Sequence, residues 1–275
     1  MHIGLVVHSH REQAWDFARR TTSLLMERGA EVSAEPLLAQ RIGLPAFDET
    51  HRPEVLMSLG GDGTFLRCVQ FALAYDVPLM GVNIGRLGFL ADTQPDALEE
   101  AIDCLLAGKY TLETRPLMEV ISGDTTALAL NDVVISRGGY ARLISVTTLV
   151  DGEEAGRFVA DGVILASPTG STGYSLSAGG PIVAPGVDCM VITPVCAHSL
   201  QHRPTVVCGQ AQIRFILGSD AEQTASVEVD GQSVASLTAG MEVTVARSPK
   251  QIQLIRTGKH PFFSTVREKL IQWTR

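Results

Sequence analysis

Residues 55–64, with the sequence Val-Leu-Met-Ser-Leu-Gly-Gly-Asp-Gly-Thr, join an apolar run to a glycine-rich turn. A short apolar run that ends in glycines is typical of a buried β-strand leading into a tight turn. A helical pattern begins directly after the turn, at about residue 64. The stretch therefore predicts a strand, a turn and a helix in succession, which is the building unit of a parallel sheet covered by helices.

The turn itself suggests phosphate chemistry. Gly60, Gly61 and Gly63 let backbone N–H groups approach a phosphate, and the start of the following helix favours negative charge. Asp62 is unusual there because a carboxylate repels phosphate, so it fits a turn that also holds a metal or takes a proton from a hydroxyl. With the hydroxyl of Thr64 beside it, we interpret the turn as a phosphoryl-transfer loop. An ordinary Asp-Gly turn is the structural alternative, and the chain lacks both common nucleotide-binding glycine motifs.

Strands and helices alternate over residues 1–110, which predicts an α/β domain with a parallel sheet. The expected strands are 3–7, 55–59 and 78–82, and the expected helices are 12–28, 65–75 and 96–106.

Short β-rich runs between turn signals follow, which predicts a mostly antiparallel β domain over residues 111–250. Asp151-Gly152 and Asp230-Gly231 are expected to form hairpin turns. Within the closing segment, 251–275, residues 262–273 predict an amphipathic helix that packs back on the first domain. The expected strands of the β domain are 117–121, 133–136, 144–150, 162–165, 191–195, 213–217, 227–229 and 243–246.

Composition excludes several classes of protein. Of the 275 residues, 45% are hydrophobic and 19% charged, which supports a sizeable core. The net charge of −8 argues against nonspecific binding to nucleic acid or anionic membrane, and no apolar stretch approaches the length of a membrane span. The first residues lack the basic start of a signal peptide, and the five cysteines show no Cys-x-x-Cys spacing. We therefore expect a cytoplasmic protein with reduced thiols.

Residues 161–181 form a second biased region, rich in glycine and hydroxylated side chains, with Tyr174 as its one aromatic residue. Hydroxyls and bare backbone suit a polyhydroxylated, phosphate-bearing ligand, and a tyrosine ring can pack on a base. A glycine-rich connecting loop is the structural alternative for this region alone.

Taken together, the motifs resemble those of the NAD kinase family in order and spacing. They are Gly-Gly-Asp-Gly-Thr at 60–64, Asn-Ile-Gly-Arg-Leu-Gly-Phe-Leu at 83–90, Leu-Asn-Asp at 130–132, and the region 161–181, with further similarity at 194–200 and 230–232. Diacylglycerol and sphingosine kinases share the first motif, whereas the run at 168–181 is specific to NAD kinases. The resemblance covers nearly the whole chain.

The resemblance implies an enzyme that phosphorylates the 2′-hydroxyl of the adenosine ribose of NAD to give NADP, with ATP or inorganic polyphosphate as donor. A divalent cation, Mg²⁺ or Mn²⁺, is expected to bridge the donor phosphates, with no direct protein ligand assigned. The family also implies a homodimer or homotetramer. A lipid kinase sharing the first motif and a catalytically silent NAD(P)-binding module remain as alternatives.

Residue roles follow from the resemblance alone. Asp62 is the expected general base, Gly63 brings backbone N–H groups to the ligand, and Arg67 faces phosphate unless it is simply a solvated helix residue. Asn131 and Asp132 match the family's Asn-Glu/Asp pair, which holds the ribose and diphosphate; a turn between strands is their structural alternative. The segment expected to wrap the adenine comprises Thr172, Gly173, Tyr174, Ser175, Leu176 and Ser177.

The remaining family positions carry less distinctive residues. Phe89 is expected to line the adenosine pocket, and Arg142 and Gln232 fall at ligand-contact positions. Asp161 maps to a contact at the nicotinamide end, which a neighbouring subunit can supply in the family. Val159 stands where many members carry a basic residue. Arg157 lies on the same face of an extended strand, so either it replaces that basic residue or the chain does without one at this position.

Two pairs of histidines are close in sequence, His8 with His10 and His198 with His202. Neither pair has a nearby cysteine or carboxylate that would complete a set of metal ligands. We expect these histidines to be turn or core residues.

Overall fold

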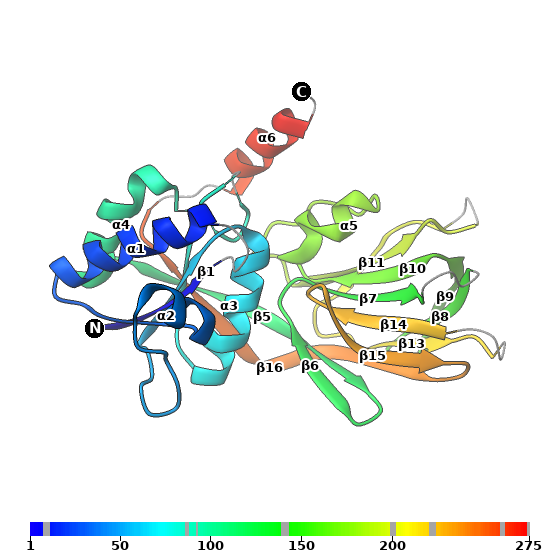
Figure 1. Ribbon diagram of the computed structural model, residues 1–275. Coiled ribbons are helices and arrows are strands. Elements are labelled where there is room, and N and C mark those ends of the chain that lie inside the picture. The colour runs from blue at the N-terminus through cyan, green and yellow to red at the C-terminus, as the bar shows by residue number, and fades with distance from the viewer. Residues whose placement is uncertain are drawn as a thin grey trace. The chain divides into compact units, whose positions relative to one another are not determined.

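The chain divides into two compact units in a computed structural model (Figure 1). The first comprises Met1–Thr114 with Ile252–Arg275, and the second comprises Arg115–Gln251. Strands β5 (Thr111–Ser122) and β16 (Glu242–Arg256) each run from one unit into the other. The structure describes residues 1–7, 12–85, 88–91, 93–138, 143–198, 202–219, 224–258 and 262–273.

A parallel sheet forms the centre of the first unit. Its strands are ordered β2-β1-β3-β4 and continue into the last part of β16, which pairs with β4 at Leu254 and Leu79. Every residue of β1, β3 and β4 is buried, as expected for a parallel sheet covered on both faces. The bounds are β1 His2–Val7, β2 Glu31–Ala34, β3 Val55–Leu59 and β4 Leu79–Val82.

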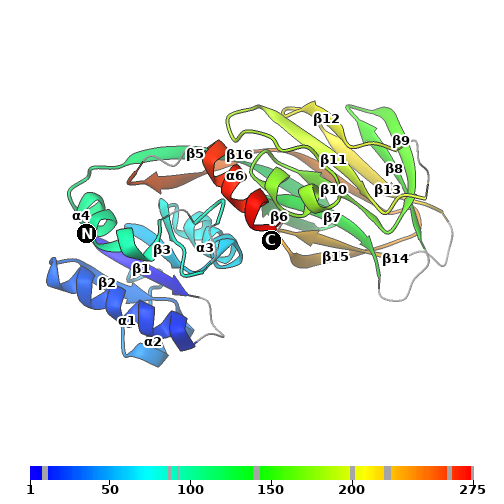
Figure 2. The same cartoon turned by 90° about the horizontal axis from the view of Figure 1, so that it is seen from above.

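Helices pack on this sheet, with α1 and α2 beside β2 and α3 beside β3 (Figure 2). The apolar faces of α1 and α2 share one core with the strands, in which Leu25, Leu38 and Met57 are fully or almost fully buried. The helices are α1 Glu12–Glu27, α2 Pro36–Ile42, α3 Asp62–Tyr75, α4 Leu98–Leu106 and α6 Phe262–Trp273, with a short 3₁₀ turn at Pro95–Ala97.

The α/β prediction for the N-terminal part is confirmed, with several boundaries shifted by one to three residues and two missed elements. Helix α3 begins at Asp62, three residues before the expected start, because Gly61 is extended and an acidic side chain suits the first turn of a helix. Strand β2 and helix α2 were not predicted. They have four and seven residues, too few to give a clear hydrophobic period.

The second unit consists of antiparallel strands in two sheets. One has the order β12-β11-β10-β7-β14-β15. In the other, β9, β8 and β13 pair in turn and β13 pairs with the first part of β16, while β5 and β6 form a hairpin. Both sheets contribute to one core, which contains Ile135, Val163, Phe215 and Val245. The predicted antiparallel β domain is thus confirmed.

The bounds of the remaining strands are β6 Thr125–Ala129, β7 Asp132–Arg137, β8 Ile144–Val150, β9 Glu153–Ala160, β10 Gly162–Ala166, β11 Cys189–Val195, β12 Thr205–Cys208, β13 Ile213–Leu217, β14 Thr224–Val229 and β15 Gln232–Thr238. The short helix α5 spans Tyr174–Ser177 and follows a 3₁₀ turn at Gly170–Thr172. Both predicted hairpin turns are present. Asp151 and Gly152 have φ of 50° and 89°, and Asp230 and Gly231 have φ of 49° and 79°. Two consecutive positive φ angles are the signature of a type I′ turn.

Candidate active site

The glycine-rich loop connects β3 to α3. Gly60 is buried against Thr64, and a side chain at Gly60 would collide with the threonine hydroxyl. By contrast, a Cβ added to Gly61 or Gly63 would meet no atom within 4 Å. These two glycines therefore border open space at the start of α3, where the first N–H groups of a helix have no partner within the helix. Such a place can accept an anion.

Asp62 is the first residue of α3, and its carboxylate accepts hydrogen bonds from the chain that follows β4. Oδ2 accepts from the N–H of Phe89 at 3.0 Å, and Oδ1 accepts from that of Leu90 at 3.1 Å and, more weakly, from Ala91 at 3.4 Å. The ammonium of Lys269 in α6 lies 3.5 Å from Oδ2. With 32% of its side chain exposed, Asp62 fixes this segment and still faces solvent.

Helix α6 covers the same segment. The Lys269 ammonium lies 4.1 Å from the centre of the Phe89 ring, and Phe262 at the start of the helix contacts Phe89 as well, at 6.4 Å between ring centres. Arg256 donates to the carbonyl of Leu90 at 3.3 Å and pairs with Glu113 at 2.7 Å. These contacts confirm that the C-terminal helix packs back on the first domain.

Arg67, expected to face phosphate, is bound to Glu35 instead. Its two terminal nitrogens lie 2.6 and 2.8 Å from the carboxylate oxygens of Glu35, and it also donates to the carbonyl of Val7. Glu35 is buried, and its carboxylate accepts the N–H of Val7 at 2.9 Å. Arg67 thus joins α3 to the carboxyl ends of β1 and β2. A phosphate contact by Arg67 stays a prediction.

In the second unit, the turn at Asp230 holds the Asn131-Asp132 motif. The Asp230 carboxylate accepts the N–H groups of Leu130, Asn131 and Asp132 at 2.8, 2.7 and 3.1 Å. The N–H of Asp230 in turn donates to the carbonyl of Asp132 at 3.0 Å. Because three amides bind one carboxylate, the backbone of the motif is fixed and its side chains are presented from a rigid base.

Those side chains have unused hydrogen-bonding capacity. The Oδ1 atom of Asn131 is buried and has no hydrogen-bond partner within the described residues. Asp132 is 7% exposed, and burial, with smaller contributions from Asp230 and Glu228, raises the pKa of its carboxyl to about 7. A buried acceptor without a partner is costly, so Asn131 is suited to a ligand that donates a hydrogen bond.

The glycine- and hydroxyl-rich region packs directly on this motif. The N–H of Ser167 donates to the carbonyl of Asn131 at 2.8 Å, and a side chain at Gly170 would collide with that carbonyl. A Cβ on Gly173 would lie 3.8 Å from Asp132 Oδ2. Two motifs that are about forty residues apart in sequence therefore meet at one place.

The six residues expected to wrap an adenine differ in exposure. Gly173, Tyr174 and Ser177 are exposed, and Leu176 is partly buried. Thr172 is buried with a long 3.4 Å bond to the carbonyl of Thr169. Ser175 is fully buried and shares a 2.8 Å hydrogen bond with Thr193, so its hydroxyl stabilises the fold around α5.

Arg137, rather than Arg157, is the basic residue beside Asp161. Arg137 Nε lies 3.1 Å from Asp161 Oδ1, across the β7–β10 pair. Arg157 points to the same face of β9 as the exposed Val159 and donates to Thr147 at 3.1 Å. Whether Arg157 replaces the missing basic residue at the ligand stays a prediction.

Two other expected contact positions complete the set. Gln232 is exposed at the start of β15. Arg142 lies outside the described residues, as do His8 and His10. His198 is exposed, and the ring of His202 packs edge-on against Phe158.

No helix among the described residues is both long and apolar enough to cross a membrane.

Comparison with known proteins decides the family. Residues 3–110 match the family model of the ATP-NAD kinase N-terminal domain, and residues 130–257 match that of the ATP-NAD kinase C-terminal domain. The chain belongs to the NAD kinase family. Among curated relatives, the NAD kinase of Desulforamulus reducens is 37% identical, with 98% of this chain and 97% of the relative covered. The NAD kinase of Gemmatimonas aurantiaca is 41% identical over 79% of this chain and 77% of the relative.

Solved structures of NAD kinases have the same fold. Yeast NADH kinase complexed with NADH superposes with a TM-score of 0.88 and 26% identity, covering 98% of this chain and 87% of that one. An NAD kinase from Archaeoglobus fulgidus in complex with ATP gives a TM-score of 0.77 and 27% identity, covering 97% of this chain and 99% of that one.

Within this NAD kinase fold, the sequence patterns alone missed four side chains. Lys269 contacts Asp62, and Glu35 contacts Arg67, each from a distant part of the chain. The Asp230 carboxylate supports Asn131-Asp132, and Arg137 pairs with Asp161. Only Asp230 had a local signal, the Asp-Gly turn, and that signal indicated a hairpin rather than a carboxylate binding three amides.

Proposed function

We propose that this chain is an NAD kinase, transferring the terminal phosphoryl group of ATP to the 2′-hydroxyl of the adenosine ribose of NAD to give NADP. Its membership of the family supports the reaction, and related structures complexed with NADH and with ATP support the two substrates. The observation that carries the proposal is the position of Asp62 at the start of α3, next to two glycines that border open space.

In this proposal Asp62 orients the acceptor hydroxyl and takes its proton. Three amides and the Lys269 ammonium fill the roughly four acceptor positions of the carboxylate. In this proposal the acceptor hydroxyl replaces one of the two longest contacts, Ala91 at 3.4 Å or Lys269 at 3.5 Å. A weak base suffices because the loose transition state of phosphoryl transfer depends mainly on positioning and charge. The ammonium of Lys269 also offsets the negative charge of Asp62, which reduces the repulsion of donor phosphates.

For the second unit we propose recognition of the dinucleotide. The buried Oδ1 of Asn131 suits a ribose hydroxyl, because it is an acceptor without a partner among the residues that the structure describes. Asp132 lies beside it in a backbone fixed by Asp230. The exposed ring of Tyr174 offers a surface on which a base can stack.

In this proposal the metal ion binds together with the phosphates of ATP. Mg²⁺ and Mn²⁺ prefer oxygen ligands and commonly bind through substrate phosphates, whose charge they neutralise. We assign no direct protein ligand to the metal, because Asp62 already accepts three amides and lies beside the Lys269 ammonium. Polyphosphate as a second donor, a homodimer or homotetramer, and a cytoplasmic location remain predictions.

A coupled assay tests the function. Purified protein is incubated with NAD, ATP and Mg²⁺, and NADP is detected with an NADP-specific dehydrogenase. The proposal predicts NADP formation that depends on both substrates. A catalytically silent module would bind NAD but form no NADP. A lipid kinase would do neither, and phosphorylation of diacylglycerol or sphingosine in place of NAD would contradict the proposal.

A further inference from the structure

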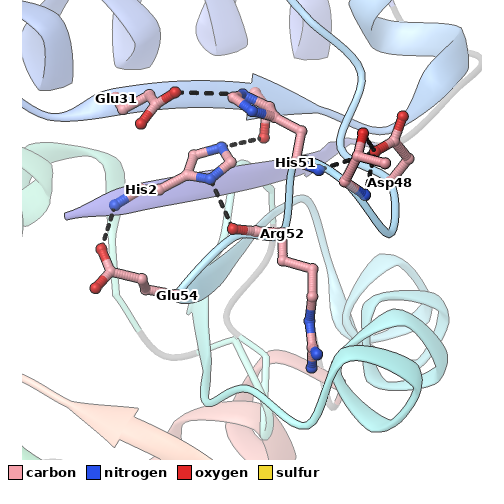
Figure 3. A network of polar contacts seen from close by, with 8 residues as sticks. His2, Glu31, Asp48, His51, Arg52 and Glu54 are labelled. Atoms are coloured by element: carbon pink, nitrogen blue, oxygen red, sulfur yellow. Dashed lines mark hydrogen bonds and ion pairs between the residues drawn. The ribbon is translucent and has the colours of Figure 1, made fainter.

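A polar cluster of two histidines and a glutamate lies where β1 and β2 begin (Figure 3). The glycine-rich loop follows the carboxyl end of β3, so it lies at the opposite ends of the parallel strands. His2 begins β1 and Glu31 begins β2. His51 belongs to the loop that precedes β3. One ligand atom of each of these residues lies within 4.8 Å of the other two. The proposed kinase reaction uses none of them.

The ring of His2 is oriented by its two hydrogen bonds. Its Nδ1 lies 2.8 Å from the carbonyl of Arg52, which can only accept, so Nδ1 carries the proton. In the neutral ring Nε2 then holds a lone pair, which accepts from the hydroxyl of Ser33 at 2.7 Å. A metal bound at Nε2 would take this lone pair in place of the Ser33 hydroxyl. His2 itself is buried. A bond from one ring nitrogen to a backbone carbonyl is the usual support of a histidine that binds a metal through the other nitrogen.

His51 faces the same point from the loop. Its Nε2 is buried and has no hydrogen-bond partner among the described residues, although Glu31 Oε1 lies 3.4 Å away. The ring centres of His51 and His2 are 4.4 Å apart. The backbone of His51 is fixed because its N–H donates to Asp48 at 2.9 Å. A buried ring nitrogen without a hydrogen bond indicates a missing partner.

We propose that His2 Nε2, His51 Nε2 and Glu31 Oε1 bind one zinc ion, or a similar transition metal such as Co²⁺ or Ni²⁺. Two imidazoles and one carboxylate suit these metals, whereas Mg²⁺ prefers oxygen ligands alone. Tetrahedral zinc with bonds of about 2.0–2.2 Å holds its ligand atoms roughly 3.4 Å apart. The His51–Glu31 distance is already 3.4 Å. Both of these side chains are partly or largely exposed and can turn toward His2.

The metal would join three segments that are distant in sequence. It would connect the first residues of β1 and β2 to the loop before β3, and water would complete the coordination. Three protein ligands and one water is the arrangement of a zinc site with an open position. The ligands lie at the amino ends of the parallel strands, whereas Asp62 lies at the carboxyl ends. The role of the metal is therefore to stabilise the loop rather than to take part in phosphoryl transfer.

Zinc titration calorimetry on the full-length, tag-free, chelator-treated protein tests the site. The experiment contains no nucleotide and no Mg²⁺, so it does not depend on the kinase reaction. We expect one zinc ion per chain with a micromolar or tighter Kd. His51→Ala and Glu31→Gln should each weaken binding about tenfold or more. His198→Ala removes an exposed histidine of the second unit and is the matched control, with unchanged binding.

Two further readouts identify the ligands. Co²⁺ should give visible absorption bands with the unmodified protein and lose them with His51→Ala. In histidine-selective ¹⁵N spectra, zinc should shift the Nε2 signals of His2 and His51 and leave His202 unchanged. Equal zinc affinity of the unmodified protein, His51→Ala and Glu31→Gln would overturn the proposal, as would a lack of zinc binding at about 100 μM metal. Because Glu31 is largely exposed, Glu31→Gln remains informative if a histidine variant does not fold.

Discussion

At the residue scale, Asp62 has two roles. It accepts three backbone N–H groups from residues 89–91, and it is the proposed base. The glycine-rich motif predicts the second role, because an acid in a phosphate-binding turn requires an explanation. The first role was not predictable, since its donors are backbone groups and the residues that contain them have no pattern that points to Asp62.

Replacing Asp62 by Asn tests both roles. The variant puts an NH₂ donor where a carboxylate oxygen accepted N–H groups, which should cost about 1–3 kcal/mol of folding free energy. Loss of the base should lower kcat by about 100-fold or more. Initial rates and thermal unfolding measure the two effects. Asp96→Asn, an exposed carboxylate of the same unit, is the control and should change neither. A near-normal kcat for Asp62→Asn would contradict the assignment.

The buried carboxyl of Asp132 should make the free energy of unfolding depend on pH. Burial raises the pKa of its carboxyl from 3.8 to about 7 in the folded protein. Between these values the folded state binds a proton that the unfolded chain has lost, so the free energy of unfolding falls as pH rises. The cost of a buried charge is absent below about pH 4 and complete above about pH 7. Asp132→Asn removes this cost.

The free energy of unfolding of Asp132→Asn should therefore exceed that of the unmodified protein by more at pH 8 than at pH 5. Denaturant titrations at the two pH values measure the difference, on the order of a few kcal/mol at most. Asp124→Asn, at an exposed turn, is the control and should show no such pH dependence. An Asp132→Asn effect that is equal at both pH values would show that the buried charge carries no cost.

At the scale of elements, segments with a clear apolar run were predictable. The missed strands are β2, β6, β9, β12 and β15, and only parts of the long strands β5 and β16 were predicted. β3, β8, β13 and α6 have the predicted bounds, because their apolar residues recur with the period of a strand or helix. β2 was missed because its four residues do not establish a period. How elements are connected by side chains was not predictable either, since it depends on pairs such as Arg67 with Glu35.

The ion pair between Arg67 and Glu35 joins α3 to β1 and β2. Removing one partner leaves the other charge without compensation, so Arg67→Met should destabilise the protein by about 3–5 kcal/mol because Glu35 is buried. The double variant Arg67→Met/Glu35→Gln should be more stable than the sum of the single effects suggests. A double-mutant cycle by denaturant unfolding measures this coupling. Additive effects would indicate that Arg67 is free to serve a ligand instead.

Helix α6 contributes Lys269 to the Asp62 carboxylate. Lys269→Met keeps an apolar contact with Phe89 but removes the positive charge, so the KM for ATP should rise several-fold, on the order of 1 kcal/mol. Lys269→Arg should restore most of the affinity. Steady-state kinetics with varied ATP measures both variants. An unchanged KM in Lys269→Met would show that the charge does not influence the donor.

At the scale of the whole molecule, one unit is continuous in sequence and the other is not. The unit Arg115–Gln251 is one segment, whereas the first unit needs Ile252–Arg275 for the edge of its sheet next to β4 and for α6. The change in sequence texture near residue 111 predicts the first crossing. The return crossing lies within β16, a single strand of 15 residues whose pattern has no break at that point.

The central claim is that this chain phosphorylates the 2′-hydroxyl of NAD with the help of Asp62. The most direct measurement is ³¹P NMR of NAD, ATP and Mg²⁺ incubated with the unmodified protein and, separately, with Asp62→Asn. The account predicts a 2′-phosphate monoester signal that grows as ATP becomes ADP, and that grows about 100-fold or more slowly with the variant. No monoester signal with the folded, unmodified protein, or equal rates for the two proteins, would contradict the account.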